Sequence, residues 1–117
     1  MTIKFHEGLT LERWQALPWD KKILNIASEL SRAKHWIRES DDAYANRSME
    51  RALELIDMTT EGGISDKSLS FLTELLRLRE ILASIYISRE KDYKELLLLI
   101  KVLLDFEVSV SNLHLEL

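Results

Sequence analysis

Three histidines are the residues best suited to acid–base or metal chemistry in this sequence: His6, His35 and His114. A di-iron helical bundle places a Glu three residues before a His, and a zinc hydrolase helix carries the pattern H-E-x-x-H. Neither spacing occurs around these histidines. His35 and Glu39 lie one helical turn apart, which favours a contact on a helix surface over a metal ligand or a catalytic base. The histidines therefore predict no catalytic site and no metal site.

Other catalytic patterns are also missing from the sequence. There is no cysteine, which excludes disulfides and thiolate metal sites. The segment "RAKH", from Arg32 to His35, is shorter than the Arg-to-His spacing of bundle-shaped toxin ribonucleases. Arg47 and Arg51 interleave with glutamates, which is typical of a solvated charged face. We expect a protein that is not an enzyme and has no cofactor, with a toxin-type nuclease as the least favoured alternative.

The composition indicates one helical domain. The chain has 117 residues, of which 46% are hydrophobic and 31% are charged, enough to bury a core without disulfides or metals. Only three glycines and one proline are available for turns, which favours long helices over many short strands. The net charge of −4 argues against a nucleic-acid partner, because nucleic acid requires a concentrated positive surface.

Neither a signal peptide nor a membrane span is predicted. The start, "MTIKFHEGLTLERW", lacks the apolar core of a secretory signal. The apolar run from Leu96 to Leu104 is interrupted by Lys101 and is shorter than the roughly 20 residues that a span needs. We expect a soluble cytoplasmic protein without a membrane partner.

Apolar residues recur at steps of three and four, which predicts four helices after an N-terminal arm. The arm covers residues 1–17 and includes a short helical turn, "LERWQAL", that Thr10 caps. The predicted helices cover residues 18–39, 41–60, 66–88 and 89–107, and residues 108–117 form a tail without helical period. Because the joints are short, neighbouring helices must be antiparallel. The expected fold is an all-α, up-down-up-down four-helix bundle in a single domain.

The joints carry residues that start or end helices. The expected positions are Pro18 in the first turn of the first helix, Ser40 to Asp42 at the entry to the second, Gly62 or Gly63 at its end, Ser65 or Asp66 capping the third, and Ser88 capping the fourth.

Each predicted helix interrupts its polar side once with a large apolar residue. The four interruptions are Trp36, Met58, Ile81 and Leu98, and a flank of further apolar residues adds Leu99, Val102 and Phe106. Isolated exposed apolar residues are normal, and the arm or the tail is one possible cover for them. The alternative is that they form a groove for an amphipathic or extended segment of a partner protein. We predict these seven residues as a partner-binding site.

Three segments resemble the flagellar secretion chaperones, which guard flagellin before its export. The first helix of that family is similar to "LPWDKKILNIASELSRAKHWI", and its second helix and connector resemble "DDAYANRSMERALELIDMTTEGGISDKSLSFL". The closing helices are similar to "REILASIYISREKDYKELLLLIKVLL". The resemblance covers residues 17–106 and implies a helical bundle that holds the amphipathic or disordered terminus of an export client in apolar grooves, without a cofactor.

Two functions therefore stay open for the apolar surface. One is a chaperone-like module that binds a protein client, in which Ile3, Phe5 and Trp14 of the arm fill the groove when no client is bound. The other is a structural homo-oligomer in which the fourth helix packs against its copy.

Overall fold

The computed structural model describes residues 3–61 and 69–115, and the side chains of residues 3–61 and 71–105. These ranges contain five helices and no strand, which confirms the all-helical fold class. The helices are α1 (Leu11–Gln15), α2 (Trp19–Arg38), α3 (Asp42–Glu61), α4 (Leu69–Ile87) and α5 (Tyr93–Leu115).

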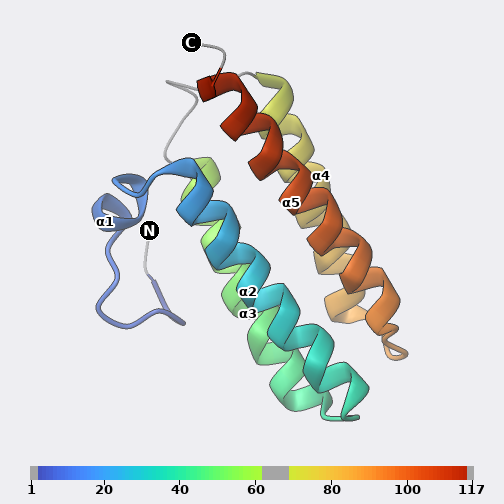
Figure 1. The fold of residues 1–117 in the computed structure, drawn as a ribbon. Coiled ribbons are helices and arrows are strands. Elements are labelled where there is room, and N and C mark those ends of the chain that lie inside the picture. The colour runs from blue at the N-terminus through green and yellow to red at the C-terminus, as the bar shows by residue number, and fades with distance from the viewer. Residues whose placement is uncertain (1–2, 62–68, 116–117) are drawn as a thin grey trace.

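The four long helices lie side by side (Figure 1). Helix α2 packs closely against both α3 and α5, whereas α4 approaches its neighbours α3 and α5 less closely. The short helix α1 packs against α3, so the N-terminal segment lies on the side of the molecule formed by α2 and α3. The sides of the molecule that α4 and α5 form are therefore not covered by this segment.

The core forms where the apolar stripes of the long helices meet. The inward positions predicted on α3 are buried at Ala45, Met49, Ala52 and Ile56. On α4 the prediction was wrong at one position: Leu76 was assigned to the core, but 43% of it is exposed. Other residues of α4 that were not assigned to the core, Leu78 and Ile85 among them, are buried instead.

The joint between α2 and α3 is a Schellman turn. The N–H of Asp41 donates to the carbonyl of Trp36 at 2.8 Å, and the N–H of Ser40 donates to the carbonyl of Ile37 at 3.0 Å. Ser40 has a φ of 60°, the left-handed conformation that usually requires glycine at this place. Of the predicted entry residues, Asp41 caps α3, since its side chain accepts the N–H of Tyr44 at 3.1 Å.

Both ends of α5 differ from the prediction. The helix begins at Tyr93, and its cap is Asp92, whose side chain accepts the N–H of Lys94 at 2.9 Å, so the assignment of Ser88 as the cap was wrong. It continues to Leu115, so the tail predicted for residues 108–117 is helical as far as the structure describes it. Serine and β-branched residues cost only a few tenths of a kcal/mol each in a helix that has already formed.

Two remaining expectations concern helix ends and membrane spans. The residues predicted to close α3 and to cap α4 lie at 62–68, outside the described residues. Pro18 precedes the first helical residue of α2 instead of occupying its first turn.

No helix within residues 3–61 and 69–115 is both long enough and apolar enough to cross a membrane.

Candidate protein-binding surface

Three of the predicted site residues are exposed apolar side chains on α4 and α5. Ile81 of α4 is 51% exposed, Leu98 of α5 is 62% exposed, and Val102 of α5 is 43% exposed. We call these three residues the α4–α5 surface. Leu98 and Val102 are four residues apart and therefore lie on one side of α5.

Helix α4 directs Ile81 away from α3. Two polar contacts define the side of α4 that faces α3: Arg79 pairs with Asp57, and the Tyr86 hydroxyl donates to Glu50 at 2.6 Å. Ile81 lies about 160° around the helix from Arg79 and about 140° from Tyr86, because each residue turns an α-helix by about 100°. The buried residues Leu78 and Leu82 lie between these two sides of α4, so Ile81 is on the flank of α4 away from α3, and α5 is the other long helix that α4 packs against.

Helix α5 directs Leu98 and Val102 away from α2. The guanidinium of Arg38 in α2 lies 5.1 Å from the centre of the Tyr93 ring, which identifies the side of α5 that faces α2. Leu98 is turned from Tyr93 by about 140° and Val102 by about 180°. Ile81 lies about 9 Å before the end of α4, whereas Leu98 and Val102 lie about 7.5 Å and about 13.5 Å after the start of α5, so Ile81 is at a height between those of the two α5 residues.

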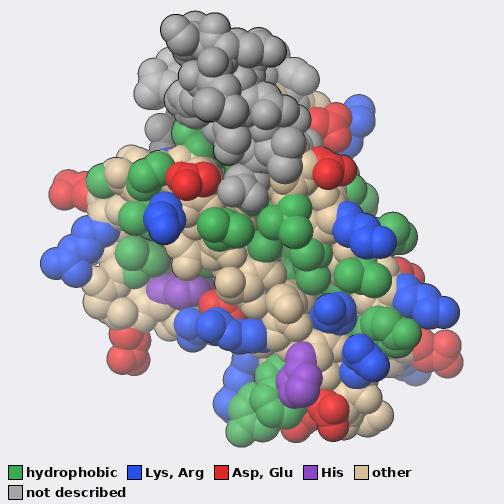
Figure 2. Space-filling model, in the orientation of Figure 1, with side chains coloured by type: hydrophobic (Ala, Val, Ile, Leu, Met, Phe, Trp, Pro, Cys, Tyr) green, Lys and Arg blue, Asp and Glu red, His purple; other side chains and the backbone are tan. Residues whose placement is uncertain are grey.

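Charged side chains surround the two α5 residues. Lys94, Glu95, Lys101 and Asp105 are exposed on the same helix. Figure 2 shows this mixture over α5, where hydrophobic side chains lie among lysine, arginine and acidic side chains. An apolar centre with a charged rim is the usual anatomy of a protein–protein contact.

The structure does not place the other predicted site residues on this surface. Met58 and Leu99 are buried in the core, so they are not accessible to a partner in this structure. Trp36 is half-buried near the C-terminal end of α2, where its ring stacks on Tyr44 at 4.9 Å. The side chain of Phe106 lies outside those that the structure describes.

The arm lies across the polar side of α3, which was expected to face solvent. The buried carboxylate of Glu54 accepts the N–H of Lys4 at 2.7 Å and the N–H of Phe5 at 3.1 Å. Nδ1 of His6 donates to the same carboxylate at 2.9 Å. Arg51, one turn earlier on α3, donates to the carbonyl of Phe5 at 2.9 Å. We call this set of contacts the arm clasp.

A second buried carboxylate, Glu29 of α2, extends the clasp. It accepts from Arg32 at 2.9 Å and from Arg51 at 3.2 Å, and it lies 3.7 Å from Nε2 of His6. Among the described residues, Nε2 of His6 has no hydrogen-bond partner, and it is shielded from solvent. The His6 side chain is therefore enclosed by two glutamates and is not presented to a substrate.

The clasp changes the acidity of Glu54. Burial alone would raise the pKa of this carboxyl, but the hydrogen bonds from His6 and from the N–H groups of Lys4 and Phe5 outweigh burial and hold the pKa below its ordinary value. The charged form of Glu54 is thus the one that fastens the arm.

Helix α1 covers the next turn of α3. Trp14 is buried, and its Nε1–H donates to the hydroxyl of Thr59 at 3.0 Å, while that hydroxyl donates to the carbonyl of Leu55 at 2.8 Å. Trp14, which was expected to fill the apolar groove, packs on α3, the helix that carries the predicted groove residue Met58.

Sequence reasoning missed Glu29 and Glu54 as clasp residues. One signal pointed to them: Met58 lies one helical turn after Glu54 and interrupts the polar side with a large apolar residue. That interruption is better explained if the N-terminal segment covers this side of α3 than if the side faces solvent.

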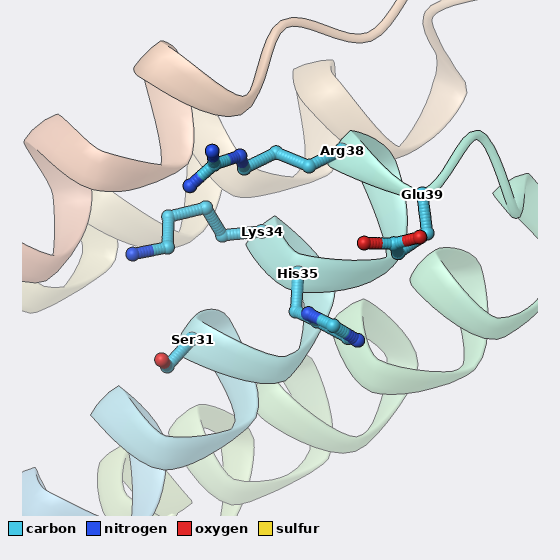
Figure 3. Close-up of a pocket in the computed structure, with 5 residues that line it drawn as sticks. All are labelled: Ser31, Lys34, His35, Arg38 and Glu39. Atoms are coloured by element: carbon cyan, nitrogen blue, oxygen red, sulfur yellow. The ribbon is translucent and has the colours of Figure 1, made fainter.

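A shallow depression of about 530 Å³ lies along the outer side of α2, lined by Ser31, Lys34, His35, Arg38 and Glu39. All five residues belong to one helix, and Figure 3 shows that their side chains do not converge on a common point. The carbonyl end of α2 and the Glu39 carboxylate also oppose an anion there. We assign no chemistry to this depression.

Comparisons with known proteins add no relative: no family model, no curated protein and no solved structure matches this chain. The resemblance to flagellar secretion chaperones therefore stays a prediction.

Proposed function

We propose that this chain is a non-enzymatic protein-binding module that docks an apolar segment of another polypeptide on its α4–α5 surface. One observation carries the proposal: Leu98 is 62% exposed on the same side of α5 as Val102, although the chain has an arm that covers apolar residues elsewhere. That arm is fastened to α3, so it does not cover the α4–α5 surface.

The proposal includes the arrangement of the helices. We propose that α2, α3, α4 and α5 form an antiparallel up-down-up-down bundle with α1 and the arm outside it. Support comes from the pairs that pack together, α2 with α3 and α5, and α4 with α3 and α5, and from the short joints at residues 39–41 and 88–92. The order of packing closes a ring of four helices.

The expected partner is an amphipathic or disordered client segment, as in an export chaperone. Burying apolar surface contributes about 25 cal/mol per Å², and full burial of a Leu, Ile or Val side chain contributes roughly 1.5–3 kcal/mol. Three side chains that are already half-buried contribute less, and ordering a client opposes them. The binding is therefore expected to be weak and reversible, which suits a chaperone that must release its client.

The experiment compares matched charge substitutions at exposed leucines. In Leu98→Glu a charge lies on the α4–α5 surface, whereas in Leu24→Glu it lies on α2, at a leucine that is 41% exposed. Both variants should keep the helical circular dichroism of the wild type, with unfolding free energies changed by less than about 1 kcal/mol, because surface substitutions cost little.

The readout is the fluorescence of a dye that binds apolar surface, added in excess at the lowest protein concentration that gives a signal, so that no second polypeptide covers the surface. We expect Leu98→Glu to lose at least half of the signal and Leu24→Glu to keep it. Equal signals from wild type and Leu98→Glu would contradict the proposal, because the α4–α5 surface would then not be the apolar site that the dye detects.

A further inference from the structure

The charges around Leu98 have no partner within the described part of the chain. Lys94, Glu95, Lys101 and Asp105 are exposed, and their side chains make no salt bridge or hydrogen bond with any residue of the described part of the chain. Several acids on the other long helices do have such partners, Glu29, Glu74 and Asp57 among them. The charges of α5 are therefore free to pair with a partner.

The charges along α5 are complementary to those of a second α5 helix in one antiparallel register. When two copies of α5 are laid antiparallel with Leu98 facing Leu98 of the copy, residue numbers that add up to 196 lie opposite each other. Glu95 then faces Lys101, and Lys101 faces Glu95. Val102 faces Lys94, whose aliphatic stem covers it while its ammonium group reaches solvent.

Asp105 faces Lys91 in the same register. The Lys91 ammonium already donates to the carbonyls of Tyr86 and Ser88, at 3.0 and 2.5 Å, so its share of this pair is smaller than that of the central pairs. The two pairs between Glu95 of one copy and Lys101 of the other therefore determine which pairing of the helices is preferred.

Other pairings of the same surface bring like charges together. A parallel pairing sets Glu95 against Glu95 and Lys101 against Lys101. An antiparallel pairing centred between Leu98 and Val102 sets Glu95 against Asp105. Like charges across a contact disfavour the wrong partner and the wrong register. The charge order thus selects the pairing centred on Leu98.

We infer that, when no client is bound, the α4–α5 surface is occupied by a second copy of this chain, through an antiparallel, two-fold contact between the α5 helices. This inference rests on the proposed function, because it names the occupant of the same surface. Leu98 of both copies forms the centre, Ile81 and Val102 lie beside it, and the pairs of Glu95 with Lys101 close both ends. A two-fold axis makes every contact that lies off the axis occur twice, which suits a short interface.

Sedimentation equilibrium of the full chain over a range of micromolar concentrations tests this inference with a charge exchange. The wild type should form a reversible dimer whose dissociation constant rises with salt. Glu95→Lys and Lys101→Glu should each raise that constant at least tenfold, because each sets like charges against one another. The double variant Glu95→Lys with Lys101→Glu should return it to within about threefold of the wild type.

Two results would overturn the inference: a monomer at every concentration, or a double variant that dimerises no better than the single ones. A variant that fails to fold is recognised by circular dichroism and replaced by Glu95→Gln and Lys101→Gln, which should weaken the dimer at least threefold. A monomer whose dye binding still depends on Leu98 refutes the dimer and leaves the proposed function standing with a different client. A monomer without that dependence refutes both.

Discussion

Ser40 adopts a backbone conformation that residues with a Cβ atom disfavour. It has a φ of 60° at the position where a Schellman turn usually has glycine. The left-handed conformation destabilises a residue with a Cβ by roughly 1–2 kcal/mol. Replacing Ser40 with glycine recovers only part of this, because glycine also makes the unfolded chain more flexible. We expect Ser40→Gly to raise the unfolding free energy by about 1 kcal/mol in urea denaturation.

Matched controls separate the conformation of Ser40 from its side chain. Ser40→Ala removes the hydroxyl but keeps the Cβ, so it should bring no gain. Ser28→Gly places the same glycine on the exposed side of α2, where it should cost roughly 0.5 kcal/mol. A Ser40→Gly variant no more stable than Ser40→Ala would refute the explanation.

Glu54 fastens the arm through its negative charge. Glu54→Gln keeps the shape of the side chain but removes the charge that accepts from His6 and two backbone N–H groups. Hydrogen bonds to a charged group contribute about 1.5–3 kcal/mol, so we expect a loss of about 2 kcal/mol at pH 7. Proteolysis should also cut the arm of this variant faster than that of the wild type.

The cost of Glu54→Gln should depend on pH. Because the pKa of folded Glu54 is below its ordinary value of 4.5, its charge stabilises the fold above that pH, and the contribution is lost as the pH falls through the lowered pKa. The difference between wild type and Glu54→Gln should therefore shrink below pH 4.5. A difference that is constant from pH 7 to pH 3 would show that the charge of Glu54 does not hold the arm.

At the scale of the element, α4 is the long helix with the loosest packing, and polar contacts attach it to α3. The Tyr86 hydroxyl donates to Glu50 at 2.6 Å, and this bond raises the pKa of Tyr86. We expect Tyr86→Phe to cost about 1 kcal/mol and to speed hydrogen exchange in α4 more than in α2. Tyr44→Phe is the control, because the Tyr44 hydroxyl makes no hydrogen bond within the part of the chain described. Equal effects of the two substitutions would contradict this attachment.

The helices themselves could be predicted from periodicity, but the inward side of α4 could not. Helix α3 has polar residues on one side, so its buried positions Ala45, Met49, Ala52 and Ile56 follow from the sequence. Helix α4 has apolar residues on several sides, and the choice between Leu76 and Leu78 depends on where α3 and α5 lie. The polar contacts of Arg79 and Tyr86 with α3 settle that choice only in the folded molecule.

At the scale of the whole molecule, the arm clasp and the α4–α5 surface lie on different sides. The clasp joins His6 to Glu54, which are 48 residues apart in sequence, so no local pattern predicts it. The exposure of Ile81, Leu98 and Val102 could be predicted, because these residues interrupt or flank the polar sides of α4 and α5. Met58 gave the same signal, but the N-terminal segment covers it, and only the assembled fold separates the two cases.

The central claim is that the α4–α5 surface meets another polypeptide, and photo-cross-linking in living cells tests it most directly. A photo-reactive amino acid replaces Ser84, which is exposed on α4 one turn after Ile81, or Ser28, on the exposed side of α2. The account predicts an adduct heavier than the 13.7 kDa chain from position 84, lost when Leu98→Glu is added, and none from position 28. No adduct at position 84, or an adduct that persists with Leu98→Glu, would contradict it.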